Sequence, residues 1–136
     1  MASLVIDTNV LSELTKVPAN ANVVTWFSEQ NPADLHLTAI TLMELEKGVE
    51  LKRRTDEKRA NQIRTQCDTL IQQYGDRILP FDTRAAGIAG KFLAQFPNVQ
   101  VEDAQIASIA KANGMTVVTR NVRDFISFGV PYHNPF

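Results

Sequence analysis

Short apolar runs alternate along the chain with longer amphipathic segments. Runs at residues 4–6, 35–38, 78–81 and 116–119 have the length and composition of buried strands, and residues 130–132 would form a last edge strand. Strands that alternate with helices in this way are parallel and are joined by crossovers. We therefore expect an α/β fold: a three-layer α/β/α domain with a central, mainly parallel sheet of four to five short strands.

The segments between these strands carry apolar residues at intervals of three and four, which predicts helices. We expect helices at about 7–14, 20–30, 41–53, 56–74, 82–96, 102–113 and 121–128. Thr41 has Glu44 three residues after it, the spacing of a capping box, so the third helix is expected to begin at Thr41.

Size and composition limit the class of protein. A chain of 136 residues is one ordinary domain, which can bury a core without disulfides or structural metal. No apolar run approaches the roughly 20 residues that span a bilayer, and the first residues lack the basic flank of a signal peptide. The one cysteine, Cys67, cannot form an internal disulfide and lies on an apolar helical stripe. A core role in a reducing cytoplasm is therefore expected.

The charges are nearly balanced, with 14 basic and 15 acidic residues, so net charge does not indicate a nucleic-acid binder. The basic residues are unevenly distributed, however. A basic cluster that would either contact phosphates or form a solvated helix face consists of Lys52, Arg53, Arg54, Lys58, Arg59 and Arg64.

Four acidic residues from distant parts of the chain fall where predicted strands end or helices begin. Asp7 follows the first strand, and Glu44 lies one turn into the helix after the second. Asp124 lies in the turn after the fourth strand, and Asp103 opens the helix that leads into that strand. Sites in open parallel sheets form beyond the carboxyl ends of the strands. We therefore expect the four carboxylates to converge on one edge of the sheet.

Carboxylates that converge raise each other's pKa unless protons or cations neutralise them. Hard oxygen ligands select Mg²⁺ or Mn²⁺, and such a site suits phosphodiester hydrolysis. Each acid alone has a structural alternative. Asp7 and Asp124 could cap helices, Glu44 could complete the capping box, and the helix dipole could favour Asp103. Their shared placement favours the metal site, and Gly48, one turn beyond Glu44, would leave space beside it.

An ordered set of segments runs through nearly the whole chain: VIDTNVLSE at 5–13, TAITLMELEKG at 38–48, ILPFD at 78–82, DAQIA at 103–107, TRNVRDF at 119–125 and NPF at 134–136. In this order they resemble the PIN-domain ribonucleases of the VapC type, the toxin half of bacterial toxin–antitoxin pairs, and most closely the FitB-like subclass. The resemblance implies a single PIN domain over residues 1–136. It also implies a metal-dependent endoribonuclease that cleaves RNA with metal-activated water and inhibits translation and growth.

The resemblance also implies roles for individual residues. Mg²⁺, for which Mn²⁺ would substitute, is expected on the acids that match the family's ligands: Asp7, Glu44, Asp103 and Asp124. Residues expected to position these acids or bound water are Asn9, Asn121, Thr8, Thr119 and Glu102. Asn121 is also an alternative to Asp124 as the last ligand. Arg84 and Arg120 would contact substrate phosphate or have structural roles at the surface.

Members of this family commonly form homodimers, and a VapB-like antitoxin usually wraps the toxin and blocks its site. The resemblance therefore implies a bacterial cytoplasmic protein that binds RNA, with transfer or ribosomal RNA as candidates. It would reach operator DNA only through its antitoxin and would not bind membranes. Trp26, Phe27, Leu51 and Ile63 are candidate interface residues, and core packing explains each of them equally well.

Three other functions compete with this one. A receiver-like phosphoacceptor domain would have paired acids near the first strand and a lysine after a late strand, whereas Asp7 stands alone and Arg120-Asn121 follows the late strand. A phosphohydrolase with an aspartyl nucleophile would have aspartate two residues after Asp7, where this chain has Asn9. A non-catalytic interaction module would have lost at least one of the four acids.

Overall fold

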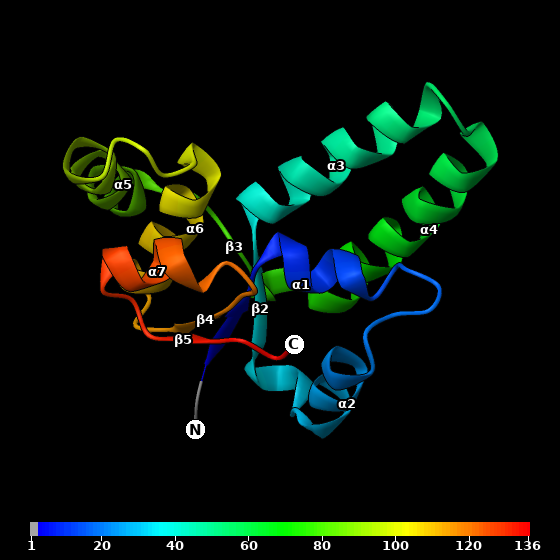
Figure 1. The fold of residues 1–136 in the computed structure, drawn as a ribbon, viewed down its shortest axis with the longest axis horizontal. Helices are drawn as coiled ribbons and strands as arrows, with labels where there is room; N and C mark the ends of the chain where they lie inside the picture. Colours follow the sequence, from blue (N-terminus) through cyan, green and yellow to red (C-terminus); the bar gives the residue numbers. More distant parts are fainter. Residues whose placement is uncertain (1–2) are drawn as a thin grey trace.

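Five short strands form one parallel sheet at the centre of the molecule (Figure 1). They are β1 (Leu4–Ile6), β2 (Leu35–Thr38), β3 (Ile78–Leu79), β4 (Thr116–Val118) and β5 (Tyr132–His133). Their spatial order is β3-β2-β1-β4-β5, and every neighbouring pair is parallel. The predicted sheet is thus confirmed, with its last strand at residues 132–133 instead of 130–132.

This structure is a computed structural model that describes residues 3–136. The prediction that the first residues are not a signal peptide falls partly on Met1 and Ala2. These two residues lie outside the described residues. Between residues 3 and 136, no helix is long and apolar enough to cross a membrane.

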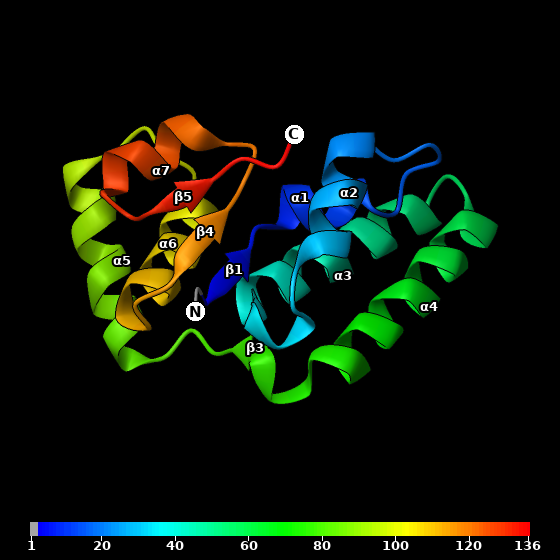
Figure 2. The same ribbon diagram turned by 90° about the horizontal axis from the view of Figure 1, so that it is seen from below.

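Two layers of helices cover the sheet (Figure 2). One layer contains α1 (Thr8–Glu13), α2 (Ala21–Glu29), α3 (Ala39–Arg53) and α4 (Glu57–Tyr74), and the other contains α5 (Thr83–Gln95), α6 (Val101–Ala112) and α7 (Val122–Phe128). Successive residues of a strand face opposite sides. Leu4 and Ile6 accordingly pack in the first core and Val5 in the second. The three-layer α/β/α arrangement is confirmed.

The strand order reverses direction between β1 and β4. From β1 the chain builds outward through β2 to β3, and it then returns to place β4 on the other side of β1 and β5 beyond it. Ile6 and Val118 are paired at the carboxyl ends of these two central strands. A crevice forms at such a switch point in open α/β sheets, so Asp7 and Thr119 lie where a ligand site is expected.

The predicted start of the third helix is wrong. The helix begins at Ala39, directly after β2, and Thr38 is its N-cap, because the Thr38 hydroxyl accepts a hydrogen bond from the Thr41 N–H at 3.1 Å. Thr41 is therefore inside the first turn, and Glu44 lies beyond it. The capping box with Thr41 does not form, which removes the structural alternative for Glu44.

The candidate interface residues are mostly part of the core. Trp26, Phe27 and Ile63 are partly buried against the first core, and Leu51 is exposed. Cys67 is buried in the same core, where burial raises the pKa of its thiol, so the expected structural role is supported.

Candidate active site at the carboxyl edge of the sheet

Asp7 is the most buried acid of the candidate site, with 2% of its surface exposed. It caps α1, and its carboxylate accepts hydrogen bonds from the Thr8 N–H (2.8 Å), the Asn9 side-chain amide (3.0 Å) and the Thr119 hydroxyl (2.7 Å). All three donors are neutral. Burial raises the pKa of Asp7 to about 6, although these hydrogen bonds lower it, and the charge of Glu44 raises it further.

Glu44 reaches the site from the second turn of α3. The Thr8 hydroxyl donates a hydrogen bond to Glu44 Oε1 at 2.7 Å, so a single residue contacts both Asp7 and Glu44. The hydroxyls of Thr8 and buried Thr41 lie 3.0 Å apart. Thr41 thus supports Thr8, a role that the sequence did not indicate because Thr41 resembled a helix cap.

Asp103 and Asp124 meet at one amide. The Asn121 side-chain nitrogen donates to Asp103 Oδ2 at 2.6 Å and to Asp124 Oδ2 at 3.2 Å. Asp103 is buried. Burial raises the pKa of Asp103 to about 8, with further contributions from the charge of Asp7 and from neighbouring Asp124.

Hydrogen bonds between loops fix the geometry of this edge. The Thr119 hydroxyl donates to Asp7 and accepts a hydrogen bond from the Asn121 N–H at 2.9 Å, which links the two halves of the site. Asn9 donates to Asp7 with its nitrogen and accepts from the Arg120 N–H at 3.1 Å with its oxygen. Four of the residues that the sequence suggested as auxiliary therefore hydrogen-bond to the acids: Thr8, Asn9, Thr119 and Asn121.

The remaining candidates lie at the margin of the site. Glu102 is half-buried and borders a hollow that Glu44 also lines. The Arg120 guanidinium lies over the Phe136 ring, 4.8 Å from its centre. The pKa of buried Glu13 is lowered mainly by the hydrogen bond from Lys16 and, to a smaller extent, by the charge of Arg120. Arg84 is exposed in the first turn of α5, and within the described part of the chain it forms no ion pair.

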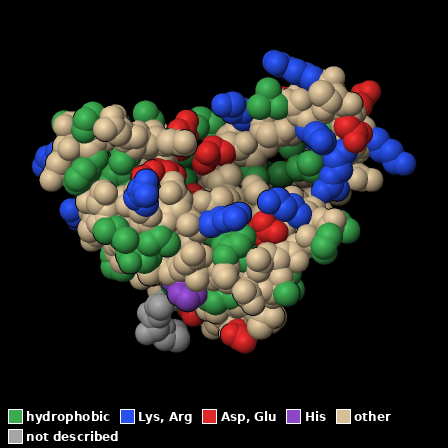
Figure 3. Space-filling view, viewed as in Figure 1, with side chains coloured by type: hydrophobic (Ala, Val, Ile, Leu, Met, Phe, Trp, Pro, Cys, Tyr) green, Lys and Arg blue, Asp and Glu red, His purple; other side chains and the backbone are tan. Residues whose placement is uncertain are grey.

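We define the acidic rim as Asp7, Glu44, Asp103 and Asp124. The fold brings these four residues to one edge, and acidic side chains are visible in the notch between α6 and the start of α3 (Figure 3). Across residues 3–136, no three His, Cys, Asp or Glu side chains are arranged closely enough to hold a metal ion. The chemistry of the rim nevertheless suits a hard cation, because its buried carboxylates have neutral donors and raised pKa values.

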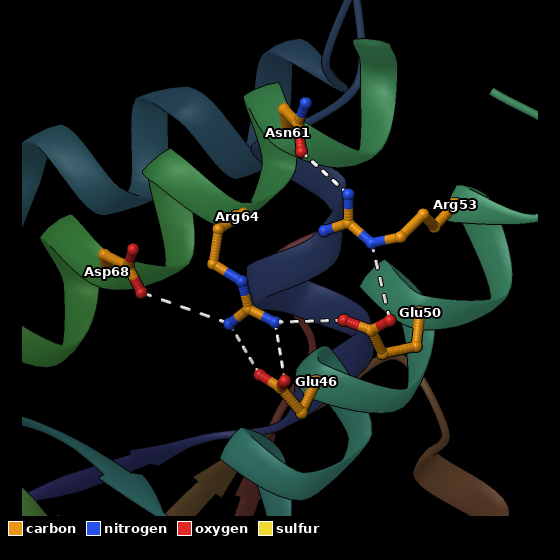
Figure 4. Close-up of polar contacts among 6 residues, drawn as sticks. All are labelled: Glu46, Glu50, Arg53, Asn61, Arg64 and Asp68. Atoms are coloured by element: carbon orange, nitrogen blue, oxygen red, sulfur yellow. Dashed lines mark hydrogen bonds and ion pairs between the residues drawn. The ribbon is translucent and has the colours of Figure 1, made fainter. Parts of the chain in front are cut away.

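Several residues of the basic cluster form ion pairs on the arm that α3 and α4 form together (Figure 4). Arg64 contacts both oxygens of Glu46 at 2.5 Å and lies 3.6 Å from Glu50, which Arg53 approaches at 3.4 Å. A third acid, Asp68, lies 4.0 Å from Arg64. We call these five residues the arm network. Arg59 donates to the Thr15 carbonyl, so half of the basic cluster is engaged within the chain.

The family model described as PIN domain matches residues 4–129 of the chain. The chain belongs to the PIN-domain family. This membership sets aside the receiver-like alternative, and the strand order also differs from the receiver order 2-1-3-4-5.

Relatives that this PIN domain matches over nearly their full length include a toxin FitB and a VapC ribonuclease. It is 36% identical to plasmid stability protein StbB of Pseudomonas syringae pv. tomato and 31% identical to toxin FitB of Neisseria gonorrhoeae, each over 98% of both chains. It is 33% identical to VapC ribonuclease Y4jK of Sinorhizobium fredii, over 98% of this chain and 97% of the relative.

Solved structures agree with this placement. FitAcB from Neisseria gonorrhoeae matches with a TM-score of 0.88 at 31% identity, over 97% of both chains. DNA-bound VapBC from Salmonella typhimurium matches with a TM-score of 0.82 at 26% identity, over the full length of both chains. Both the fold and the subclass expected from the sequence are confirmed.

Proposed function

We propose that this PIN domain is a Mg²⁺- or Mn²⁺-dependent endoribonuclease and the toxin of a toxin–antitoxin pair. The observation that carries the proposal is the acidic rim. Asp7 and Asp103 are buried, have raised pKa values and receive only neutral hydrogen-bond donors. An arrangement of this kind is unfavourable unless protons or a cation neutralise it, and a bound cation would do so at pH values where the carboxylates are ionised. Relatives named as ribonuclease and toxin support RNA as the substrate.

Asp7, Glu44 and Asp103 would hold the ion, and Asp124 would complete the site directly or through water. Such an ion lowers the pKa of water and stabilises negative charge on phosphate oxygens. Asn121 would keep Asp103 and Asp124 oriented toward it. No histidine lies among the residues that form the rim, so the carboxylates are the groups that would accept the proton of the attacking water.

Partners follow from the same relatives. The similar solved structures include FitAB bound to a DNA fragment and DNA-bound VapBC. We propose that a VapB-like antitoxin binds this chain, blocks its site and links it to operator DNA, and that the chain alone is a homodimer. Cleavage of transfer or ribosomal RNA would inhibit translation. A co-expressed antitoxin should abolish cleavage, and the solution mass of the chain should correspond to two copies.

The central test is cleavage of an end-labelled RNA by the purified chain. EDTA should stop cleavage, Mg²⁺ or Mn²⁺ should restore it, and the products should carry a 5′-phosphate and a 3′-hydroxyl. Asp7→Asn should lower the cleavage rate about 1000-fold or more while circular dichroism shows an unchanged fold, because metal ions contribute several kcal/mol to such reactions. Glu50→Gln, an equivalent acid-to-amide change in the arm network, is the control.

Two outcomes would overturn the proposal. Full cleavage by folded Asp7→Asn would exclude the acidic rim as the catalytic centre. A folded parent chain that neither binds Mn²⁺ nor cleaves RNA would indicate a non-catalytic interaction module instead.

A further inference from the structure

Two hollows extend the acidic rim outward along α3. One, of about 400 Å³, is bordered by Lys47 and Glu102, and the other, of about 200 Å³, is bordered by Ser12 and Lys52. Glu44 and Gly48 line both of them. The two hollows therefore meet at one turn of α3, directly beyond the acidic rim.

Gly48 is not explained by the conformation or the packing of the chain. Glycine is unfavourable in a helix interior, and Gly48 is not among the glycines with positive φ. Apart from its chain neighbours and the backbone of its own helix, a Cβ atom added at Gly48 would have no heavy atom within 4 Å. The absence of a side chain here leaves the surface beside Glu44 open without serving a contact inside the described protein.

The lysines beside these hollows have no acidic partner. Between residues 3 and 136, neither Lys47 nor Lys52 forms an ion pair, whereas Arg53 and Arg64 on the same arm are neutralised by glutamates. Both lysines are exposed. Within the described residues, two unpaired lysine side chains thus border open space next to the acidic rim. A phosphate group would fit this open space and would be attracted to the lysines.

Helical spacing aligns these features. Glu44, Gly48 and Lys52 follow one another at intervals of four residues and so lie on one face of α3. The rise of the helix separates Glu44 from Lys52 by about 12 Å along its axis. Lys47 lies on the flank of the same turn as Gly48. A chain of phosphates leaving the acidic rim along this face would pass Gly48 and reach a lysine on either side.

We propose that this face of α3 binds the RNA strand next to the cleaved bond, with its backbone passing over Gly48 and its phosphates contacting Lys47 and Lys52. The inference rests on the proposed ribonuclease function, and it adds the direction in which the substrate leaves the acidic rim.

Binding of a fluorescently labelled single-stranded RNA, measured by anisotropy in Mg²⁺ from 50 to 200 mM salt, tests the proposal. All proteins carry Asp7→Asn so that RNA stays intact. Lys47→Gln and Lys52→Gln should each reduce the slope of log affinity against log salt by about 0.7, the value for one phosphate contact on a single strand. Lys58→Gln, which removes the same charge elsewhere on the arm, should leave the slope unchanged.

Gly48→Leu tests the open surface independently. It should weaken RNA binding at least tenfold while the thermal midpoint stays equal or rises, because leucine favours the helix and its Cβ atom would meet no neighbouring side chain. Gly90→Leu is the matched control, since Gly90 also lies within a helix with open space around it but borders neither hollow. Gly48→Ala, with little bulk, should have a smaller effect than Gly48→Leu.

The proposal is overturned if the Lys47 and Lys52 variants keep the parental slope, if Gly48→Leu binds RNA like the parent, or if the Asp7→Asn protein binds no RNA. These outcomes are separate from the cleavage assay. If cleavage is absent but the slopes change as expected, only the catalytic proposal fails. If cleavage depends on metal and Asp7 but the slopes do not change, only the binding face is wrong.

Discussion

The acidic rim and the arm network are both groups of carboxylates, but their surroundings differ. In the arm network, Arg64 donates to Glu46 and lies near Glu50, and this pairing lowers the pKa of Glu46. In the acidic rim, Asp7 and Asp103 receive hydrogen bonds from hydroxyl, amide and backbone N–H groups, Asp103 also contacts Asp124, and the pKa values of Asp7 and Asp103 are raised. One group is neutralised by the chain itself and the other is not.

This difference separates carboxylates that are paired with arginine from carboxylates that remain able to bind an external cation. Exposed ion pairs such as those of the arm contribute little to stability, but their two arginines balance most of the charge of the three acids. Neutral donors fix the direction of a carboxylate but leave its charge in place, and buried charge is costly. Asn9 and Asn121 occupy positions from which a lysine or arginine would neutralise the neighbouring aspartates. With such a residue there, no external cation would be needed.

The largest expected effect comes from giving the acidic rim a cation of its own. Asn121→Lys would place an ammonium group near Asp103 and Asp124 and would occupy the charge that a metal ion uses. Mn²⁺ affinity should fall at least about 100-fold, because even neutral changes next to metal ligands cost 10- to 100-fold. Isothermal titration calorimetry measures this, and the thermal midpoint without metal should rise.

The control for that variant is Asn113→Lys, which adds the same charge at the exposed C-cap of α6. It should leave Mn²⁺ affinity unchanged. Equal affinities for the Asn121→Lys and parent proteins would mean that the acidic rim does not bind the ion.

Metal should stabilise the folded chain by mass action. At a Mn²⁺ concentration 100 times the Kd, the gain is about 2.7 kcal/mol, on the order of 10 °C in thermal midpoint for a domain of this size. Scanning fluorimetry with and without Mn²⁺ measures it. Glu50→Gln should retain the gain, whereas Asp7→Asn should lose most of it, and a full gain in Asp7→Asn would place the ion elsewhere.

Without metal, stability should depend on pH in the direction set by the acidic rim. The folded pKa values of Asp7 and Asp103, about 6 and about 8, lie above the ordinary value of 3.8, so the folded state binds more protons. Their contribution is complete below pH 3.8 and is lost as pH rises through these values. The free energy of unfolding in EDTA should therefore fall from about pH 4 upward, by up to about 1.4 kcal/mol per unit for each group, with Asp7 contributing up to about pH 6 and Asp103 up to about pH 8.

Urea unfolding at several pH values provides this measurement. Asp103→Asn should flatten the dependence, and Asp68→Asn on the arm should not. A parent chain that becomes more stable as pH rises from 5 to 8 would contradict the raised pKa values.

The smallest effect is expected in the arm network. Arg64→Gln removes contacts to Glu46, Glu50 and Asp68, yet exposed ion pairs contribute little, so the thermal midpoint and the cleavage rate should change only slightly. A large loss of cleavage with an intact fold would show that the arm network acts on the site, and the contrast with the acidic rim would fail.

The sequence predicted most of this architecture because its signals are local. Apolar runs marked four of the strands and the approximate place of the fifth, and their alternation with helices indicated parallel pairing. The positions of Asp7, Glu44, Asp103 and Asp124 at one edge then followed from topology. The start of α3 was not predictable in the same way, because Thr38 and Thr41 both suit an N-cap and only the course of the chain after β2 decides between them.

Sequence patterns also could not predict the contacts between distant segments. Nothing local indicates that Thr41 lies beside Thr8, or that Arg64 pairs with acids while Lys52 forms no ion pair within residues 3–136. These outcomes depend on how α3 packs against α1 and α4. The spacing did indicate open space at Gly48 beside Glu44, and the structure confirms it.

The central place of β1 in the sheet has a consequence for the order in which the chain is made. Asp7 is synthesised early, but the hydroxyl that completes its hydrogen bonds belongs to Thr119, 112 residues later, and the neighbouring strand β4 is equally late. A nascent chain that stops before residue 116 contains Asp7 and Glu44 without the strand that orients them. If the chain is the toxic nuclease proposed here, a ribosome translating it would be exposed to no cleavage until β4 and Thr119 had emerged.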